Sequence, residues 1–341
     1  PSSYGPRRTA TTIDLMEMTG VSIRASVFRF EVLDKAFTVL GTLDVDRDRP
    51  PTVKNDTTRT IFRTLDDLTV DPVTAADLDT IEARIRPVAT LEDGTDWPLG
   101  VFLFVDASRP VRRVGRELSG SLNDLLFEAD QAVDETVAYP RGTNLATILE
   151  DQAAQVGYPL VAIDATNRVL SKPIAWPAGT HRLAILTEVA TMAGMLAPYM
   201  ANDGTFTCRK APSSVDLSDP DLRYKDGGRI IADAATESDD LLHSPNRWIV
   251  IDDSSTDAPV VGVYDLPSSS PVSIARRGFP VADVQTLQGL DGPDAANDAA
   301  MANAVNAGLG FELVTFDAVP DYRHDTHDDI EYLGDVYRET S

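Results

Sequence analysis

The stretch SIRASVFRFEVLDKAFTVLGTLDVD, residues 22–46, decides the fold class because it reads as two strands joined by a short turn. Residues 22–34 and 36–46 are both rich in β-branched and aromatic side chains, which favour strands. Only the boundary at Asp34 and Lys35 separates them, and so tight a connection suits an antiparallel pair. A β-hairpin is therefore predicted here.

The same pattern continues through the first third of the chain. Further strand-like runs are predicted at 58–65, 80–91, 97–107 and 112–122. The turn signals DDLTVDP and EDGTD fall between them. Several short strands at this spacing are typical of a barrel or a sandwich.

The middle of the chain changes to helical spacing. In NLATILEDQAAQVG the apolar residues recur as on one helix face, with Thr143 placed to cap the start and Gly157 to end the helix. In HRLAILTEVATMAG, Thr180 and Gly194 are placed in the same way. The turn sequence ANDG then sits between two short apolar runs and predicts a hairpin. Residues 143–210 are thus predicted to form a small α/β unit.

The last third returns to strands. Strands are predicted at 247–253, 258–266 and 311–319, and an alanine-rich helix at 294–310. The fold class is therefore α+β and mainly β. We predict a β-rich region at 1–142, an inserted α/β unit at 143–210 and a second β-rich region at 211–341.

The charge of the chain is strongly biased. Of its acidic residues 41 are Asp and 13 are Glu, against 25 Arg and 5 Lys, which leaves a net charge of −24. Such a surface repels itself at low ionic strength and is screened at about 1 M salt. The composition resembles that of proteins from salt-loving archaea, with a GC-rich actinobacterial source as the alternative. It disfavours tight wrapping of nucleic acid, which needs clustered Lys and Arg.

Two classes of protein are not indicated. No run of 18 apolar residues occurs, and residues 1–10 are polar with two arginines, so neither a membrane span nor a secretory signal is predicted. Cys208 is the single cysteine, so an internal disulfide is excluded. We expect it to be a buried and inert strand residue.

The segment PDYRHDTHDDIEY, residues 320–332, holds half of the histidines and is the strongest candidate for a metal site. His324 and His327 are three apart, whereas zinc hydrolases usually place two histidines four apart on a helix. No glycine stands among Asp325, Asp328 and Asp329 to make a calcium-loop turn. We therefore expect a solvated loop that leads into a strand, and no metal ligand.

Other catalytic patterns are also missing. The sequence contains no GxSxG, HExxH or GxxxxGK[ST] motif. His181 is expected to lie exposed at a helix start, and His243 has no serine or cysteine partner at a known spacing. Trp97, Trp176 and Trp248 stand next to turn or strand signals and are expected to be core anchors. We predict no catalytic residue and no cofactor.

The order of these pieces resembles that in a known family. The pieces are FRFEVLD with VLGTLDVD, WPLGVFLF, LSGSLNDLLFEAD, PRGTNLATILEDQAAQVG, WPAGTHRLAILTEVATMAG, YMANDGTFTCRKAP, HSPNRWIVID, the alanine-rich helix and DAVPDYRHDTHDD. In this order they resemble the minor tail proteins, or baseplate and tail-tip hub proteins, of long-tailed (siphovirus-like) bacterial and archaeal viruses.

The resemblance implies a structural protein of the virion that is made in the host cytoplasm and is not an enzyme. It implies a homotrimeric ring at the distal end of the tail tube, with two β-barrel-like tube-type domains in each subunit. The implied partners are other copies of the chain, a distal tail protein or tail tube ring, a tape measure protein and tail fibre or spike proteins. DNA would pass only transiently through the lumen, and an acidic lumen would repel its phosphates.

Two other functions stay open. One is a tail-associated hydrolase, a peptidase or glycosidase that opens the host envelope with carboxylates or a metal near residues 321–331. The abundance of aspartate makes accidental carboxylate pairs inevitable, so no pair is assigned to glycoside hydrolysis. The other is a cation-binding adhesin that recognises the host surface.

Overall fold

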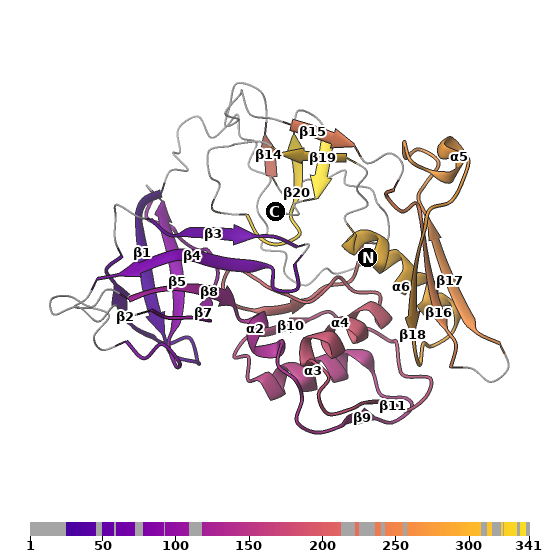
Figure 1. Ribbon diagram of the computed structural model, residues 1–341, viewed down its shortest axis with the longest axis horizontal. Coiled ribbons are helices and arrows are strands. Elements are labelled where there is room, and N and C mark those ends of the chain that lie inside the picture. Colours follow the sequence, from indigo (N-terminus) through magenta and orange to yellow (C-terminus); the bar gives the residue numbers. More distant parts are fainter. Residues whose placement is uncertain are drawn as a thin grey trace.

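The structure is a computed structural model, and its architecture is mainly β with a central group of helices (Figure 1). It describes residues 25–45, 50–57, 59–71, 78–91, 93–108, 118–212, 222–224, 236–239, 243–254, 258–307, 312–315, 322, 324–332 and 335–338. In this part of the chain, no helix is both long and apolar enough to cross a bilayer.

The first region forms one eight-stranded sheet in the order β2-β1-β5-β7-β8-β4-β3, with β6 paired to β5. Its strands are β1 (Ala25–Leu33), β2 (Val39–Leu43), β3 (Thr52–Asn55), β4 (Arg63–Val70), β5 (Arg84–Leu91), β6 (Asp96–Pro98), β7 (Phe102–Phe104) and β8 (Leu118–Asp124). The predicted hairpin is confirmed, because β1 and β2 pair antiparallel.

The sheet is curled but its described strands do not close a barrel. Val45, just beyond β2, forms an isolated antiparallel bridge to Val70 at the end of β4. A continuous ladder between β2 and β4 is not present among the described strands. The curled sheet encloses the apolar cluster Leu43, Leu65, Leu68, Val70, Ile85, Phe102, Leu118 and Leu122.

The predicted strand at 58–65 is shifted in the structure. Strand β4 runs from Arg63 to Val70 and passes through the segment predicted as a turn. Leu65, Leu68 and Val70 are buried, so the apolar residues keep the segment in the sheet. Asp67 takes a positive φ of 60° where the register to β8 shifts, as in a β-bulge. Strand β3 was not predicted.

The predicted strand at 97–107 is broken into β6 and β7. Gly100, between them, has φ 127°, and a Cβ there would lie 2.7 Å from the Phe102 ring. Only glycine fits this turn of the backbone. The prediction at 112–122 is right for its C-terminal half, where β8 begins at Leu118; residues 109–117 lie outside the described residues.

The central region contains α2 (Leu126–Ala129), α3 (Leu145–Val156) and α4 (Arg182–Met192). Short strands accompany them: β9 (Val137–Tyr139) pairs with β11 (Ile174–Trp176), and β10 (Val161–Ile163), β12 (Tyr199–Met200) and β13 (Phe206–Cys208) form a second small sheet. The predicted ANDG hairpin is confirmed by the antiparallel β12–β13 pair.

The helix ends follow the prediction at both C-termini and at neither N-terminus. Gly157 ends α3 in the left-handed conformation, as predicted. At the start of α3 the cap is Asn144, because its side chain accepts a hydrogen bond from the Ala146 amide, while the Thr143 hydroxyl donates to Pro140 O. Thr180 likewise donates to Pro177 O, so α4 begins after His181. At its other end Gly194 takes a left-handed φ of 69° directly after the C-cap, and its amide donates to Thr191 O (2.9 Å), as predicted.

The last region holds three separate small sheets among the described strands. These strands are β14 (Leu222–Tyr224) with β20 (Asp329–Tyr332) and β21 (Asp335–Arg338), β15 (Thr236–Asp239) with β19 (Glu312–Thr315), and β17 (Val260–Asp265) with β16 (Arg247–Asp252) and β18 (Ala282–Leu287). The helices are α5 (Ile274–Arg277) and α6 (Pro293–Asn306). Strand predictions at 247–253 and 258–266 and the alanine-rich helix are confirmed.

Helix α6 packs tightly on the sheet of β16–β18. Its alanines, including Ala296, Ala299 and Ala300, are fully buried. Gly262 of β17 lies against Ala296, and a Cβ on Gly262 would be 2.0 Å from the Ala296 carbonyl carbon. Helices α4 and α6 also contact each other, so the central helices and this sheet share one hydrophobic core.

Candidate functional site

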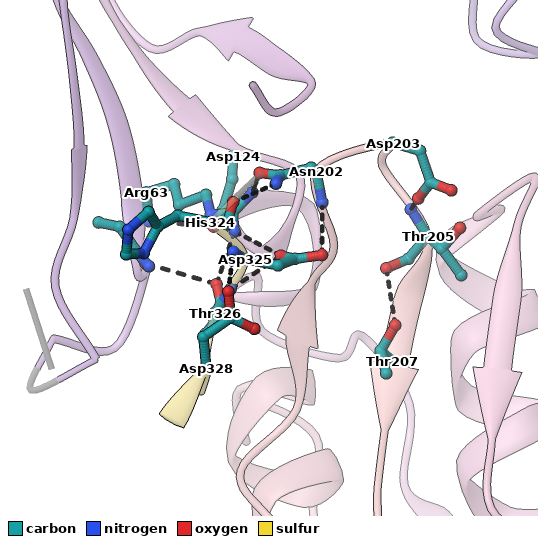
Figure 2. Close-up of polar contacts among 11 residues, drawn as sticks. Arg63, Asp124, Asn202, Asp203, Thr205, Thr207, His324, Asp325, Thr326 and Asp328 are labelled. Carbon is teal, nitrogen blue, oxygen red and sulfur yellow. Dashed lines mark hydrogen bonds and ion pairs between the residues drawn. The ribbon is translucent and has the colours of Figure 1, made fainter. Parts of the chain in front are cut away.

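Of the segment that the sequence singles out, residues 320–332, the part 324–328 lies between the first sheet and the central β12–β13 hairpin (Figure 2). Residues 320, 321 and 323 lie outside the described residues. The part 324–328 is not the solvated loop that was predicted, because Thr326 is only 1% exposed. The strand predicted to follow it is confirmed as β20. We call Arg63, Asp124, Asn202, Asp325 and Thr326 the Arg63 junction.

Arg63 lies at the centre of the junction, at the first position of β4, with its side chain 3% exposed. Its guanidinium donates from Nη1 to Asn202 Oδ1 (2.5 Å). From Nη2 it donates to Asp325 Oδ1 (2.6 Å) and to Thr326 Oγ1 (2.8 Å). Arginine suits this position because its planar fork holds several acceptors at fixed angles and stays charged when buried. One side chain thus joins three distant parts of the chain.

Asn202 fixes the hairpin side of the junction. Its side-chain amide donates to the His324 carbonyl, and its backbone amide donates to Asp325 Oδ2 (3.4 Å). Its own carbonyl accepts from the Gly100 amide (3.0 Å). The hairpin is therefore bound both to the first sheet and to the C-terminal segment.

Asp325 also organises its own loop. Its backbone amide donates to Asp328 Oδ2 (2.7 Å), and its Oδ1 accepts from the Thr326 amide (2.8 Å). Two of the three aspartates considered for a hard cation, Asp325 and Asp328, thus accept hydrogen bonds from backbone amides. Asp325 also neutralises the buried arginine. In the portion of the chain described, no three His, Cys, Asp or Glu side chains are grouped as metal ligands would be.

Asp124, the last residue of β8, binds the backbone of Arg63 through its side chain. Its Oδ2 accepts from the Arg63 amide (3.1 Å) and its Oδ1 from the Leu126 amide (2.9 Å). The residue is 1% exposed. Burial raises the pKa of its carboxyl to about 6, against the opposing effect of both amide hydrogen bonds and of Arg63.

The two histidines of the segment have different roles. His327 takes a positive φ of 67°, and its ring meets Phe62 and Tyr199 edge-on, with centroids 5.9 and 5.2 Å away. His324 contributes its backbone carbonyl to the junction. The ring contacts of His327 are those of a packing residue.

The remaining residues singled out from the sequence lie elsewhere. Cys208 is fully buried in β13, which confirms a buried strand residue, and burial raises the pKa of its thiol. His181 is largely exposed and bonds through Nδ1 to Asp130 Oδ1 (2.9 Å), as expected for the surface. His243 lies in a turn before β16.

The tryptophan predictions are right at two of three positions. Trp176 and Trp248 are buried at 6% and 2% exposure. Trp97 is half-buried on the short strand β6. The prediction of core anchors thus holds where the strand lies inside the shared core.

A pocket of about 270 Å³ adjoins the junction. Its walls come from the β3–β4 loop, from α4, from the loop before β12, from the end of α6 and from the C-terminal segment. The lining residues are Thr57, Arg59, Thr60, Phe62, Leu183, Thr187, Ala197, Pro198, Asn306 and His327. A second, more open pocket of about 520 Å³ lies on the first sheet, beside Asp67, Asp106 and Ser119.

Sequence reasoning did not single out Arg63, Asp124 or Asn202. Asn202 was recognised only as part of a turn, and Arg63 stands in TRTIFRTL without any local signal. Arg63 and Asn202 are 139 residues apart and Arg63 and Asp325 are 262 apart, while Asp124 is 61 residues from Arg63. The arrangement as a whole joins distant parts of the chain.

No family model matches this sequence, and no curated protein matches it. The fold, however, is similar to two solved structures. The tail protein from Neisseria meningitidis MC58 aligns with a TM-score of 0.53 at 17% identity, over 85% of this chain and 79% of that one. The 43 kDa tail protein of prophage MuSo2 from Shewanella oneidensis aligns with a TM-score of 0.53 at 10% identity, over 84% and 81%. The chain thus shares its overall fold with tail proteins.

Proposed function

We propose that this chain is a structural protein of a phage-type tail, located at the tail tip or baseplate, with no catalytic turnover. The observation that carries the proposal is the fold, which aligns with two tail proteins over about four-fifths of each molecule. The order of sequence motifs supports the same family independently of the coordinates.

The Arg63 junction supports a mechanical role. A buried and satisfied network of hydrogen bonds and an ion pair rigidifies the parts that it connects. Here it connects the first sheet, the β12–β13 hairpin and the segment before β20. A tail component must keep its shape while neighbouring subunits load it, and this arrangement meets that need.

The proposed assembly is a ring of three copies that closes the tail tube and adapts it to fibre or spike proteins. Its other neighbours are proposed to be a distal tail protein or tube ring and a tape measure protein. In the described residues one eight-stranded curled sheet is present beside three small sheets. We propose that β14, β15, β19 and β20, which lie together in Figure 1, and β21, which pairs with β20, belong to the second tube-type module.

The charge suits a channel wall. DNA that leaves through a ring must not bind to it, and a wall of carboxylates repels phosphates. The net charge of −24 motivates this part of the proposal. It predicts that aspartates line the lumen of the assembled ring, and a mainly basic lumen would contradict it.

Electron microscopy of virions with gold-labelled antibody against this chain tests the location. Label at the distal end of the tail is the expected result. Label on the capsid or along the whole tube would overturn the proposal.

The enzymatic alternative needs a separate test. Purified protein is assayed for bound metal and for cleavage of envelope polymers, and the substitutions His324→Ala and His327→Ala are then compared. No metal and no turnover are expected. Cleavage that disappears in both variants would replace the structural proposal by a hydrolase.

A further inference from the structure

The sheet of β16–β18 has one face covered and one face open. Helix α6 covers the face that carries Trp248, Val250 and Gly262. The opposite face consists, by register, of three rows across the strands. We call this the outer sheet face: Arg247, Ile249, Ile251, Val261, Val263, Asp265, Ala282, Val284 and Thr286.

The centre of the outer sheet face is apolar and exposed. Ile249 pairs with Val263 on one side and with Val284 on the other, and Ile251 pairs with Val261. Val261, Val263 and Val284 are 46%, 43% and 55% exposed. Contiguous β-branched side chains on an open face mark an interaction surface rather than scattered surface residues.

The outer sheet face also carries no net charge. Its charged members are Arg247 and Asp265, which form a two-bond ion pair at 2.6 and 2.7 Å. The guanidinium of Arg247 lowers the pKa of Asp265, so both groups stay ionised and their opposite charges cancel. On a chain with a net charge of −24, such a face is where another acidic surface can approach without repulsion.

A second apolar surface lies at the other end of the molecule. Strand β2 ends the order of the first sheet, and its Val39 and Leu40 are 49% and 66% exposed. Ile81, 80% exposed, stands next to Glu82, which pairs with Lys35 of the β1–β2 turn (3.2 Å). We call Val39, Leu40 and Ile81 the β2 edge. Figure 1 shows β2 and the β16–β18 sheet at opposite ends of the longest axis.

We propose that copies of this chain associate head-to-tail, with the outer sheet face of one copy seated on the β2 edge of the next. A closed ring needs two different surfaces on each subunit, whereas a two-fold dimer uses the same surface twice. Two exposed apolar surfaces at opposite ends meet the first requirement. Asp34, in the turn beside the β2 edge, is kept ionised because hydrogen bonds from Thr38 and Ala36 lower its pKa. The negative charge of Asp34 would be repelled by Asp34 of a second β2 edge, whereas the outer sheet face has no net charge to repel it.

The inference rests on the ring in the proposed function and names its contacts. Its test uses sedimentation velocity of the purified full chain between 0.1 and 1 M salt. The face variants are Val263→Asp with Val284→Asp, and Val263→Lys with Val284→Lys. The edge variant is Val39→Asp with Leu40→Asp. The control is Leu160→Asp, because Leu160 is 42% exposed and lies before β10, on neither surface.

The wild-type chain and the control are expected to assemble beyond the monomer. Each face or edge variant is expected to remain a monomer, whether the new charge is negative or positive. An equimolar mixture of a face variant and the edge variant retains one intact contact, so it should form a dimer and nothing larger. Circular dichroism and melting curves check that each variant is folded.

Several results would overturn the inference. One is a wild-type chain that stays monomeric throughout, and another is a control that dissociates as the variants do. Assembly of the edge variant alone would indicate face-to-face contact, and a mixture without dimers would exclude the head-to-tail contact. If the chain is monomeric in solution but labels the tail tip of virions, the proposed function stands and this inference fails.

Discussion

Arg63 and Asp325 are separated by 262 positions in the chain, and their side chains meet at 2.6 Å. The arginine side chain is 3% exposed and the aspartate 29%. This ion pair therefore ties the segment before β20 to the first sheet, and Asn202 and Thr326 complete the set of acceptors. The stability of the joined regions should depend on this single arginine.

Replacement of Arg63 by Ala should lower the free energy of unfolding by about 3–5 kcal/mol, because it leaves polar partners buried without their cation. Urea denaturation measures the change. A second signature is expected in limited proteolysis, since the C-terminal segment loses its anchor on β4 and should be cleaved earlier than in the wild type.

Lys54→Ala is the matched control. Lys54 and Asp66 form an ion pair at 2.8 Å in the same sheet, but their side chains are 60% and 30% exposed. Solvent screens exposed pairs and they contribute little to stability, so this variant should unfold almost as the wild type does. An equal loss from both substitutions would show that burial of Arg63 is not what matters.

Asp124 should give the protein a distinctive dependence on pH. Burial raises the pKa of its carboxyl from 3.8 to about 6, so its contribution to stability is full below about 3.8 and is lost as the pH rises through about 6. The difference corresponds to about 3 kcal/mol. In Asp124→Asn this group no longer titrates. The stability of the variant relative to the wild type should therefore rise between pH 4 and pH 7.

Asp93→Asn should show the opposite sign. Hydrogen bonds from Thr95 lower the pKa of the exposed Asp93 carboxyl, so its contribution to stability is present above its ordinary value and is lost as the pH falls. The variant should therefore lose stability relative to the wild type as the pH rises from 3 to 5. Parallel curves for Asp93→Asn and Asp124→Asn would contradict both assignments.

Gly262→Ala should loosen the packing of α6. The added Cβ would lie 2.0 Å from the Ala296 carbonyl carbon, so the helix must move away from β17, at a cost of about 1–3 kcal/mol or more. Gly41→Ala, on the exposed strand β2, meets nothing within 4 Å and serves as the control. Thermal unfolding of the two variants compares them, and equal melting temperatures would refute the close approach.

The sequence predicts those parts of the fold in which a local pattern coincides with burial. A tight turn marks the β1–β2 hairpin, and the turn sequence ANDG marks the β12–β13 hairpin. A left-handed glycine, Gly157, marks the C-terminal end of α3. In β4 the local prediction was wrong. Two adjacent aspartates indicated a turn, but Leu65 and Leu68 are fully buried in the core and the segment stays in the strand. Tertiary packing overrides turn propensity there.

The junction shows why the candidate site was predicted only in part. The segment around Asp325 attracted attention because histidines and carboxylates gather in it. Its actual role is set by Arg63 and Asn202, and their distance along the chain leaves no local trace. Composition drew attention to the segment but predicted that it lies in solvent, because aspartates are mostly exposed unless they are paired. The partly buried Asp325 is paired with Arg63.

Cys208 should be unreactive in the folded protein. It is fully buried in β13, and burial raises the pKa of its thiol, so the nucleophilic thiolate is scarce and inaccessible. A thiol reagent such as iodoacetamide should label the native chain at least tenfold more slowly than the denatured chain, measured by mass spectrometry. Equal rates would show that the β12–β13 sheet opens readily.

Salt should stabilise the chain. The net charge of −24 comes mostly from aspartates, and their mutual repulsion destabilises the compact state at low ionic strength. At about 0.01 M salt the screening length is about 30 Å, which spans much of a domain, and at about 1 M it is about 3 Å. The melting temperature should therefore rise steadily from millimolar to molar sodium chloride. Because sodium chloride acts here by screening, potassium chloride at the same concentration should give the same rise. A melting temperature that does not change over this range would show that repulsion between the acidic residues does not destabilise the fold. The composition would then give no physical reason to expect a salt-loving source.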